Sequence, residues 1–226
     1  MHNPMKLHFK VQALVVICLF FYQFSFAQNA LKVACIGNSI TYGSGIANRV
    51  ENNYPSQLQK MLGSTVQVQN FGVSGATLLM LGDKPYWKES AFRDALDYKP
   101  DVVIIKLGTN DTKPFNWDLY GQYFSDDYKR LVQRLRKANP DVQFLICLPV
   151  PVFGDAFNIR ESVMTNEVLK LVKQVASDEK LPLVDLHTPL LDKVAMFPDK
   201  IHPNADGAKV IAQLVFDALK KNRLVK

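Results

Sequence analysis

The sequence predicts a single α/β domain, a three-layer α/β/α sandwich built on a five-stranded parallel sheet. Short apolar runs alternate along the chain with longer helical patterns. Most of the short runs are nearly continuous in apolar residues, which is typical of strands covered by helices on both faces. No linker, repeat or low-complexity stretch divides the chain, so we expect one domain.

Five apolar runs are predicted as strands, at residues 31–37, 66–73, 101–108, 142–148 and 182–186. The second run partly alternates between apolar and polar residues, whereas the others are almost wholly apolar. This pattern indicates a parallel sheet, for which we expect the flavodoxin-like order of strands.

Helical patterns separate these strands, at residues 54–62, 86–98, 118–138 and 161–179, and a last one covers 204–221. The third contains the mixed-charge stretch "DDYKRLVQRLRKANPD", which is typical of the solvent-exposed face of an amphipathic helix.

The N-terminal residues 1–27 are expected to be a secretory signal peptide. Two lysines precede an apolar run over residues 11–22, and Ser25-Phe26-Ala27 places small residues at the cleavage positions. The alternative is a membrane-anchoring helix, but this run is shorter than the ~20 residues that span a bilayer. We therefore expect an exported bacterial protein, periplasmic or secreted, with no stable membrane insertion after cleavage and a mature domain over 28–226.

The charge balance gives little support to a nucleic-acid partner. The net charge of the whole chain is +6, and loss of residues 1–27 lowers it to +4. Basic residues are mixed with acids, and no groove-reading motif accompanies the C-terminal "KKNRLVK". Cys35 and Cys147 lie inside apolar strand-like runs and are expected to be free, buried thiols.

Metal and nucleotide chemistry also find little support. His187 and His202 are the histidines beyond residue 27, and no paired cysteines lie near either, so we expect no metal site. The stretch "GNSITYGSG" lacks the third glycine of a dinucleotide fingerprint and any phosphate-loop lysine. We expect no cofactor.

Reactive residues gather at one edge of the predicted sheet. In sheets of this order, functional groups lie in the loops that leave the carboxyl ends of the strands. The five strands are followed by "GNSITYGSG", "SGAT", "TNDTKPFNW", "PVPVFGD" and "HTPL", and "FPDKIHPN" precedes the last helix.

Nucleophilic catalysis fits these loops. Ser39 follows the first strand, and a serine needs a base and a group that orients the base. Asp199 and His202 can supply both from one loop. The alternatives are that Ser39 caps a helix, that Asp199 and His202 only line a helix entrance, or that His187, partnered by Asp185, is the base.

Acyl transfer also needs donors aimed at the oxyanion. Candidates at the same edge are the backbone N–H groups of Ser39 and Gly75 and the side-chain amide of Asn110. A glycine can equally serve turn geometry, and Asn110 can form an ordinary Asx-turn.

Four stretches, "CIGNSITYG", "NFGVSGAT", "VIIKLGTND" and "DKIHPN", resemble in order and spacing the four blocks of the SGNH (GDSL-like) hydrolase family. The resemblance spans residues 33–207. It implies the flavodoxin-like SGNH hydrolase fold and a carboxylic ester hydrolase.

By this resemblance the nucleophile falls on Ser39, the acid and base on Asp199 and His202, and the oxyanion donors on Ser39, Gly75 and Asn110. A Ser-His-Asp triad of this kind implies an acetyl- or acyl-enzyme intermediate.

Gly72 is a second, less favoured claimant for the oxyanion glycine. Asn38 stands where the family block usually has aspartate, which leaves the triad intact but changes local hydrogen bonding.

The longer pattern is similar to exported bacterial sialate and other carbohydrate O-acetylesterases. Trp87 and Trp117 lie in loops where an indole could stack on a sugar, although either could instead pack a loop down. Lys106 interrupts an apolar strand, and the sequence assigns it no function.

Two other functions stay open. One is hydrolysis of lipid or aryl esters, as in a lysophospholipase or arylesterase, which a preference for longer acyl chains would reveal. The other is a non-enzymatic carbohydrate-binding module, against which the intact Ser39, Asp199 and His202 argue.

Overall fold

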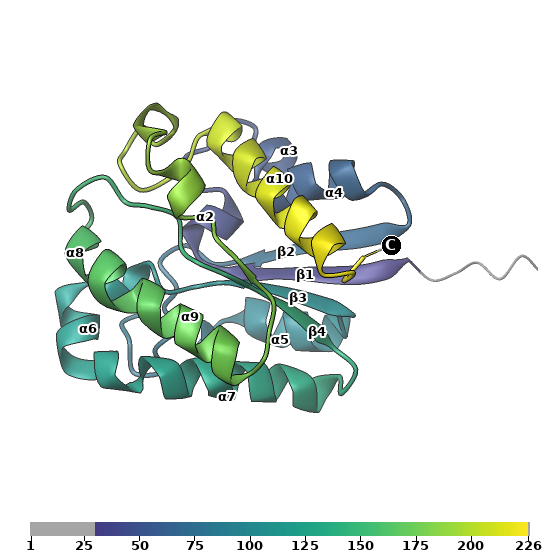
Figure 1. Cartoon of the computed structure of the whole chain (residues 1–226), viewed down its shortest axis with the longest axis horizontal. Coiled ribbons are helices and arrows are strands. Elements are labelled where there is room, and N and C mark those ends of the chain that lie inside the picture. The colour runs from purple at the N-terminus through teal and green to yellow at the C-terminus, as the bar shows by residue number, and fades with distance from the viewer. Residues whose placement is uncertain (1–29, 226) are drawn as a thin grey trace, which may run out of the picture.

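Five parallel strands form one sheet in the order β2-β1-β3-β4-β5 (Figure 1), in a computed structural model that describes residues 30–225. Each neighbouring pair is parallel. The predicted fold class and strand order are therefore confirmed, whereas the predicted signal peptide lies outside the described residues. The strands are β1 (Leu31–Gly37), β2 (Val66–Gly72), β3 (Val102–Lys106), β4 (Gln143–Cys147) and β5 (Leu183–Val184).

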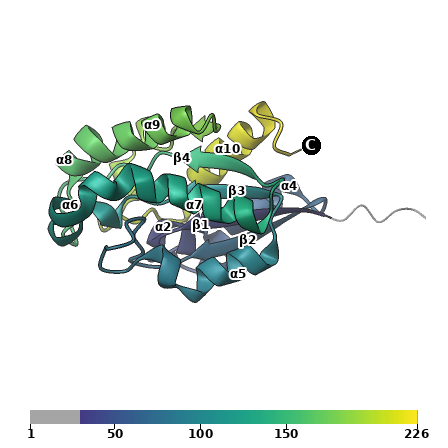
Figure 2. The same ribbon diagram turned by 90° about the horizontal axis from the view of Figure 1, so that it is seen from below.

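Helices cover both faces of the sheet (Figures 1 and 2). The helices are α2 (Ser39–Tyr42), α3 (Arg49–Asn52), α4 (Tyr54–Leu62), α5 (Ser90–Tyr98), α6 (Pro114–Tyr120), α7 (Phe124–Ala138), α8 (Glu161–Val163), α9 (Leu169–Asp178) and α10 (Ala205–Lys221). Leu58 of α4 and Ile211 of α10 belong to one buried cluster. Phe92 of α5, Leu131 of α7 and Val172 of α9 belong to the cluster on the opposite face.

The two cores explain why the strands read as continuous apolar runs. Successive side chains of a strand point to opposite faces. In β3, Val103 and Ile105 enter the α5/α7/α9 core, and Val102 and Ile104 enter the α4/α10 core. Because both faces are dry, every position needs an apolar side chain, and the fully buried Lys106 at the end of β3 is the departure.

Several predicted boundaries were wrong. The predicted helix at 118–138 is split into α6 and α7 by a 3₁₀ turn at Gly121–Tyr123. A Cβ at Gly121 would lie 2.9 Å from the Trp117 ring, so the chain passes too close to the indole for a larger residue. Within the predicted helix at 161–179, Met164–Val168 forms a π turn. The last strand is shorter than predicted because it pairs with β4 over only two residues.

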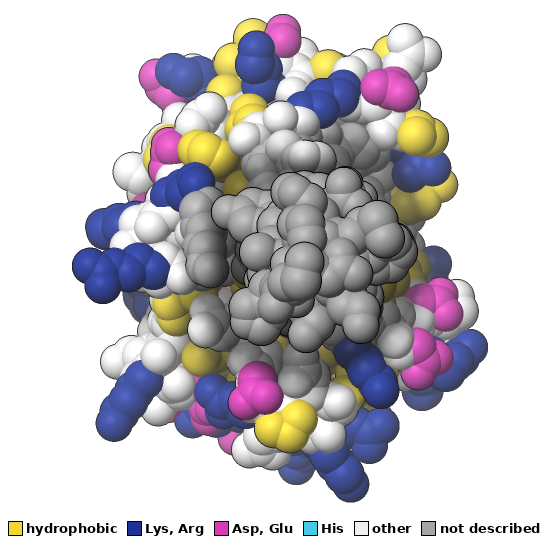
Figure 3. Space-filling view, turned by 90° about the vertical axis from the view of Figure 1, so that its right-hand side faces the viewer, with side chains coloured by type: hydrophobic (Ala, Val, Ile, Leu, Met, Phe, Trp, Pro, Cys, Tyr) yellow, Lys and Arg dark blue, Asp and Glu magenta, His cyan; other side chains and the backbone are white. Residues whose placement is uncertain are grey.

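The surface carries mixed charge. On the face seen in Figure 3, lysine and arginine side chains lie among aspartate and glutamate side chains. Within residues 30–225, no helix is both long and apolar enough to cross a membrane.

Two glycines hold the short helix α2 against the end of the sheet. Gly37 and Gly72 are paired across β1 and β2. A Cβ on Gly37 would lie 2.1 Å from Thr41 Oγ1, and one on Gly72 would lie 2.2 Å from the backbone nitrogen of Tyr42. Only glycine permits this approach. The backbone contact therefore fixes α2, whose first residue is Ser39, at the carboxyl edge of β1.

Candidate active site

Three side chains from opposite ends of the chain form a continuous hydrogen-bonded relay. Ser39 begins α2 directly after β1, while Asp199 and His202 lie in the loop before α10. His202 Nε2 is 2.8 Å from Ser39 Oγ, and His202 Nδ1 is 2.7 Å from Asp199 Oδ2. The imidazole can therefore take a proton from the serine hydroxyl while the carboxylate holds its tautomer.

The loop that carries Asp199 and His202 is held by its own backbone. Asp199 Oδ1 accepts hydrogen bonds from the N–H groups of Ile201 (3.0 Å) and His202 (2.7 Å). Asn204 then caps α10 by accepting from the N–H of Gly207. The three-residue spacing of Asp199 and His202 thus forms a turn that leaves the second carboxylate oxygen for the ring.

Asp199 is held in its charged form. Partial burial acts to raise the pKa of its carboxyl, but the hydrogen bonds from the backbone and ring of His202 and from Ile201 outweigh burial and lower the pKa. An ionised carboxylate stabilises the imidazolium that forms when His202 accepts a proton.

Three N–H donors lie on neighbouring turns at this edge. The N–H of Ser39 is at the first position of a helix, where it has no intrahelical acceptor. Asn110 directs one amide hydrogen to the carbonyl of Ala76 (3.1 Å), which leaves its second hydrogen for another acceptor. Gly75 adopts φ +81°, a left-handed conformation that glycine takes without strain.

Gly72, the other claimant for the glycine role, has a different place. Its N–H donates to Asn70 Oδ1 (2.9 Å), and its Cα lies against the backbone of α2. The geometry therefore gives Gly72 a packing role and leaves Gly75 as the candidate donor.

Asp111, which sequence reasoning passed over, joins the two loops that carry Gly75 and Asn110. Its buried carboxylate accepts the N–H groups of Leu78 (3.1 Å) and Leu79 (2.8 Å). Burial raises the pKa of Asp111 to about 6, against these hydrogen bonds, which lower it. The sequence signal that could have identified Asp111 is its position directly after Asn110 in the "TND" stretch.

Ser44 and Ser74 connect the turn that begins at Ser39 to the turn that contains Gly75. Their hydroxyl oxygens are 2.6 Å apart. Ser44 follows α2, and Ser74 directly precedes Gly75, so this contact brings the turns of Ser39 and Gly75 together.

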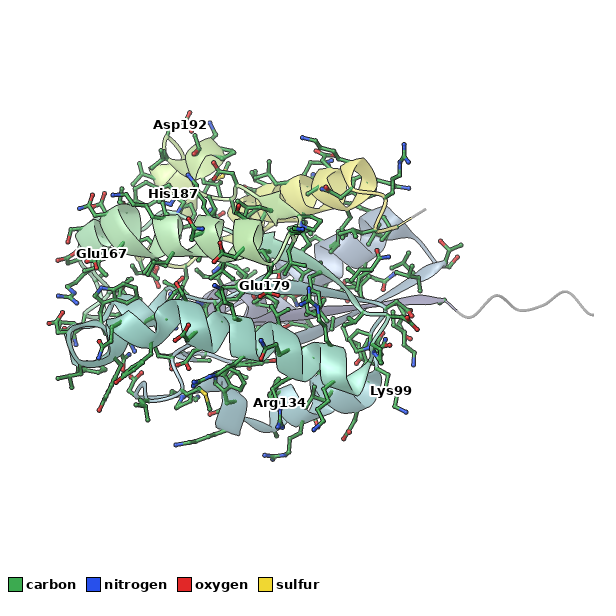
Figure 4. All side chains as sticks on the ribbon, turned by 60° about the horizontal axis from the view of Figure 1, so that its bottom comes forward. Lys99, Arg134, Glu167, Glu179, His187 and Asp192 are labelled. Atoms are coloured by element: carbon green, nitrogen blue, oxygen red, sulfur yellow. The ribbon has the colours of Figure 1, made fainter. Side chains whose placement is uncertain are left out.

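The surroundings of His187, the alternative base, differ from those of His202. Asp185 Oδ1 accepts the backbone N–H groups of His187 (2.8 Å) and Thr188 (3.0 Å), and thus caps a turn. The ring Nδ1 of His187 is 3.3 Å from the carbonyl of Pro149, and burial lowers the pKa of the imidazole. Figure 4 labels His187, and among the described residues its ring forms a hydrogen bond to a backbone carbonyl.

The two tryptophans do not join the triad. Trp117 is only 7% exposed, and its ring packs on Phe124 while its Nε1 donates to Glu167 (3.0 Å). Trp87 lines a cavity of about 580 Å³ beside α5 and α7, together with residues such as Phe92 and Arg134. The residues of the triad are not among those that line this cavity.

Phe157 is an aromatic residue at the site that sequence reasoning missed. Its side chain is 63% exposed, and its ring centre is 6.0 Å from that of His202. Phe157 and Asn158 both have positive φ angles, of 53° and 60°. Two consecutive non-glycine residues in this region are costly, and such strain clusters at functional sites.

Asn38 caps α2, the short helix that begins at Ser39. Its Oδ1 accepts the N–H of Ile40 (3.1 Å) and also faces Lys106 Nζ (3.3 Å).

Within residues 30–225, no group of three or more histidine, cysteine, aspartate or glutamate side chains is arranged to hold a metal ion. Cys35 and Cys147 are both buried and unpaired.

Comparison with known proteins identifies the class. Residues 35–210 match the GDSL-like lipase/acylhydrolase family, and the chain belongs to this family. The match contains every residue of the relay described above.

One relative is an acetylxylan esterase of Xylanibacter ruminicola, 44% identical over 213 residues, which are 85% of this chain and 44% of that protein. A multidomain esterase of Ruminococcus flavefaciens is 26% identical over 49% of this chain and 14% of its own length. The chain thus spans less than half the length of these curated relatives.

Solved structures show the same fold. The aryl esterase of M. smegmatis has a TM-score of 0.67 and 19% identity, over 85% of this chain and 99% of its own. A carbohydrate acetylesterase family member from Sinorhizobium meliloti has a TM-score of 0.64 and 21% identity, over 84% of this chain and 98% of its own.

The two histidines give a direct test of the relay. His202→Ala should lower kcat by about four orders of magnitude or more, because the serine loses its base. His187→Ala should keep most of the activity, because its ring contacts a backbone carbonyl. Rates of p-nitrophenyl acetate hydrolysis by the two purified variants, both checked for folding by circular dichroism, measure the difference. The reverse ranking would overturn the assignment.

Proposed function

We propose that the protein hydrolyses O-acetyl esters of carbohydrate by a serine mechanism, with Ser39 as nucleophile, His202 as base and Asp199 as its orienting acid. The observation that carries the proposal is the relay itself, with 2.8 Å between Ser39 Oγ and His202 Nε2 and 2.7 Å between His202 Nδ1 and Asp199 Oδ2.

In the first half-reaction, His202 Nε2 takes the proton of Ser39 Oγ as the oxygen attacks the acetyl carbonyl carbon. The carbonyl π electrons move to the oxygen, which becomes an oxyanion facing the N–H groups of Ser39 and Gly75 and the amide of Asn110. When the oxyanion collapses, the bond to the sugar oxygen breaks and His202 returns its proton to that oxygen. An acetyl group remains on Ser39.

In the second half-reaction, water attacks the acetyl-enzyme while His202 takes one of its protons. The new oxyanion occupies the same donors, and its collapse breaks the bond to Ser39 Oγ, which recovers its proton from His202. The products are acetate and free enzyme. Asp199 stays ionised throughout and stabilises each imidazolium.

The relatives and the exposed aromatic ring beside His202 support the proposed substrate class. The acetylxylan esterase relative is 44% identical over most of this chain, so acetylated xylan is the first substrate to test and acetylated sialic acid the second. The exposed ring of Phe157 beside His202 offers a flat apolar surface on which a pyranose can stack. We propose that residues 1–27 direct export, which would bring the enzyme to such polymers.

The proposed function is tested by acetate release from acetylated xylan, acetylated sialic acid and p-nitrophenyl esters of two to eight carbons. We expect release from acetylated carbohydrate and a preference for acetyl over longer esters. Ser39→Ala should lower kcat by about 10⁴-fold or more, because it removes the attacking oxygen. A folded Ser39→Ala variant with over a tenth of the wild-type rate would contradict the mechanism, and preference for octanoate would favour the lipid-esterase alternative.

The role of Asn110 is tested separately. Its amide should stabilise the full charge of the intermediate more than the partial charge of the ester carbonyl. Loss of one such donor typically costs ~10²- to 10³-fold in kcat, or roughly 3 to 4 kcal/mol. Asn110→Ala should therefore lower kcat by that order and leave KM nearly unchanged in steady-state assays. A raised KM with unchanged kcat would make Asn110 a binding or structural residue.

Phe157 should act on binding. Phe157→Ala removes an exposed ring, so we expect a KM for acetylated xylo-oligosaccharide raised by about 5-fold, as a lost stacking contact of ~1 kcal/mol implies. The KM for p-nitrophenyl acetate, which has no sugar, should change less. Leu191→Ala, at an exposed leucine of the loop after β5, is the control and should change neither. Equal effects on both substrates would argue against a sugar platform.

A further inference from the structure

Lys106 is the last residue of β3 and lies behind the turn of Ser39, the proposed nucleophile. It is paired in register with Gly37, two residues before Ser39, and its side chain is fully buried. Its Nζ donates to Asn38 Oδ1 at 3.3 Å, and within residues 30–225 no carboxylate forms an ion pair with it. A buried lysine without a counter-ion is costly, since burial disfavours the charged form.

The groups around Lys106 do not supply a negative charge. Cys147 on β4 acts on it electrostatically, and Cys35 on β1 and Tyr54 on α4 belong to the same buried cluster. Burial raises the pKa of all three groups, that of Cys35 to about 12, so they stay neutral near pH 7. Burial of Lys106 in turn lowers its pKa to about 7.

Asn38 connects Lys106 to the reacting groups. The peptide bond after Asn38 carries the N–H of Ser39, so the backbone angles of Asn38 (φ −97°, ψ −154°) set the direction of that donor. Oδ1 of Asn38 accepts both from Ile40 N–H and from Lys106 Nζ. Its Nδ2 is buried with no hydrogen-bond partner among the described residues. The side chain is therefore held through its oxygen alone.

We propose that Lys106 is a positioning residue for the nucleophile, which fixes Asn38 and thereby aims both the hydroxyl and the backbone N–H of Ser39. The inference rests on the proposed serine mechanism. Lys106 touches no reacting atom, and it exchanges no proton with substrate. A neutral amine and an ammonium can both donate to Asn38, so the contact persists on either side of neutrality.

If Lys106 positions the nucleophile, replacing it with an apolar residue should have opposite effects on the stability of the fold and on the rate of hydrolysis. In the unfolded chain the lysine has its ordinary pKa of 10.5, so between about pH 7 and 10.5 the unfolded state binds more protons than the folded state. The cost of burying the charge of Lys106 is thus complete below about pH 7, declines as the pH rises from about 7 to 10.5, and is absent above that. Methionine fills a similar volume without this cost.

Lys106→Met should therefore keep or raise Tm, with the largest gain at pH 7 and below, while kcat falls by about 10- to 100-fold from a misaimed serine. KM should change by less than about two-fold, because no substrate contact is lost. Calorimetry and p-nitrophenyl acetate kinetics measure both. Ile104→Met, two residues earlier on the same strand face, is the matched control and should keep wild-type kcat.

A double-mutant cycle with Asn38→Asp tests the contact itself. Aspartate can still cap Ile40, and Lys106 can neutralise it, so Asn38→Asp alone should keep kcat within a few-fold. In the Lys106→Met background the same change buries an unpaired carboxylate, so the two effects should be strongly non-additive. Additive effects, wild-type kcat in Lys106→Met, or a fall in kcat matched by a lower Tm would each overturn the inference.

Ser39→Ala separates this inference from the proposed function. An inactive Ser39→Ala variant beside a fully active Lys106→Met variant would overturn only the role of Lys106. An active Ser39→Ala variant would overturn the serine mechanism and the inference with it.

Discussion

The hydrogen bond between His202 Nε2 and Ser39 Oγ joins residues 163 positions apart in the chain, and the proposed serine mechanism depends on it. It forms because parallel strands carry every following loop to the same edge of the sheet. The position of Ser39 is fixed by the paired glycines Gly37 and Gly72, because their lack of a side chain lets α2 pack directly against the ends of β1 and β2. The histidine loop is fixed from the side, where Gln57 of α4 donates to the carbonyl of Ala205 at the start of α10.

The residues next to Ser39 include two buried polar side chains that reduce the stability of the fold. Asn38 and Lys106 are both fully buried, and neither has its full complement of hydrogen-bond partners among the described residues. A core that only had to be stable would place apolar groups there, as the rest of β3 does with Val102 and Ile104. Buried polar groups that are expensive for folding and adjacent to a reacting group are typical of sites where function sets the residue.

Sequence reasoning predicted the sheet from local signals, and it named Ser39, Asp199 and His202 as candidates from short motifs and from the family resemblance. Continuous apolar runs reveal strands with two dry faces, and the Asp199–His202 turn is built from neighbouring residues. It failed where the answer depends on distant contacts. Phe157 reaches the site through a strained loop that no periodicity encodes. Lys106 stood out by its type, but its partner Asn38 lies 68 residues away.

The two loops that carry Asn110 and Gly75 are joined through the carboxylate of Asp111, whose charged form is disfavoured by burial. The carboxylate of Asp111 holds the N–H groups of Leu78 and Leu79, and burial raises its pKa to about 6. Because this value lies above the ordinary pKa of 3.8, the folded state binds the proton more readily than the unfolded state between about pH 6 and 3.8. Protonation of Asp111 in this pH range does not favour unfolding. It does place a hydrogen on one of the two carboxyl oxygens, each of which already accepts a backbone N–H. Acid should therefore loosen the alignment of the loops that carry Asn110 and Gly75 although this group does not weaken the fold, so the geometry of the site is more sensitive to this protonation than the sheet that supports it.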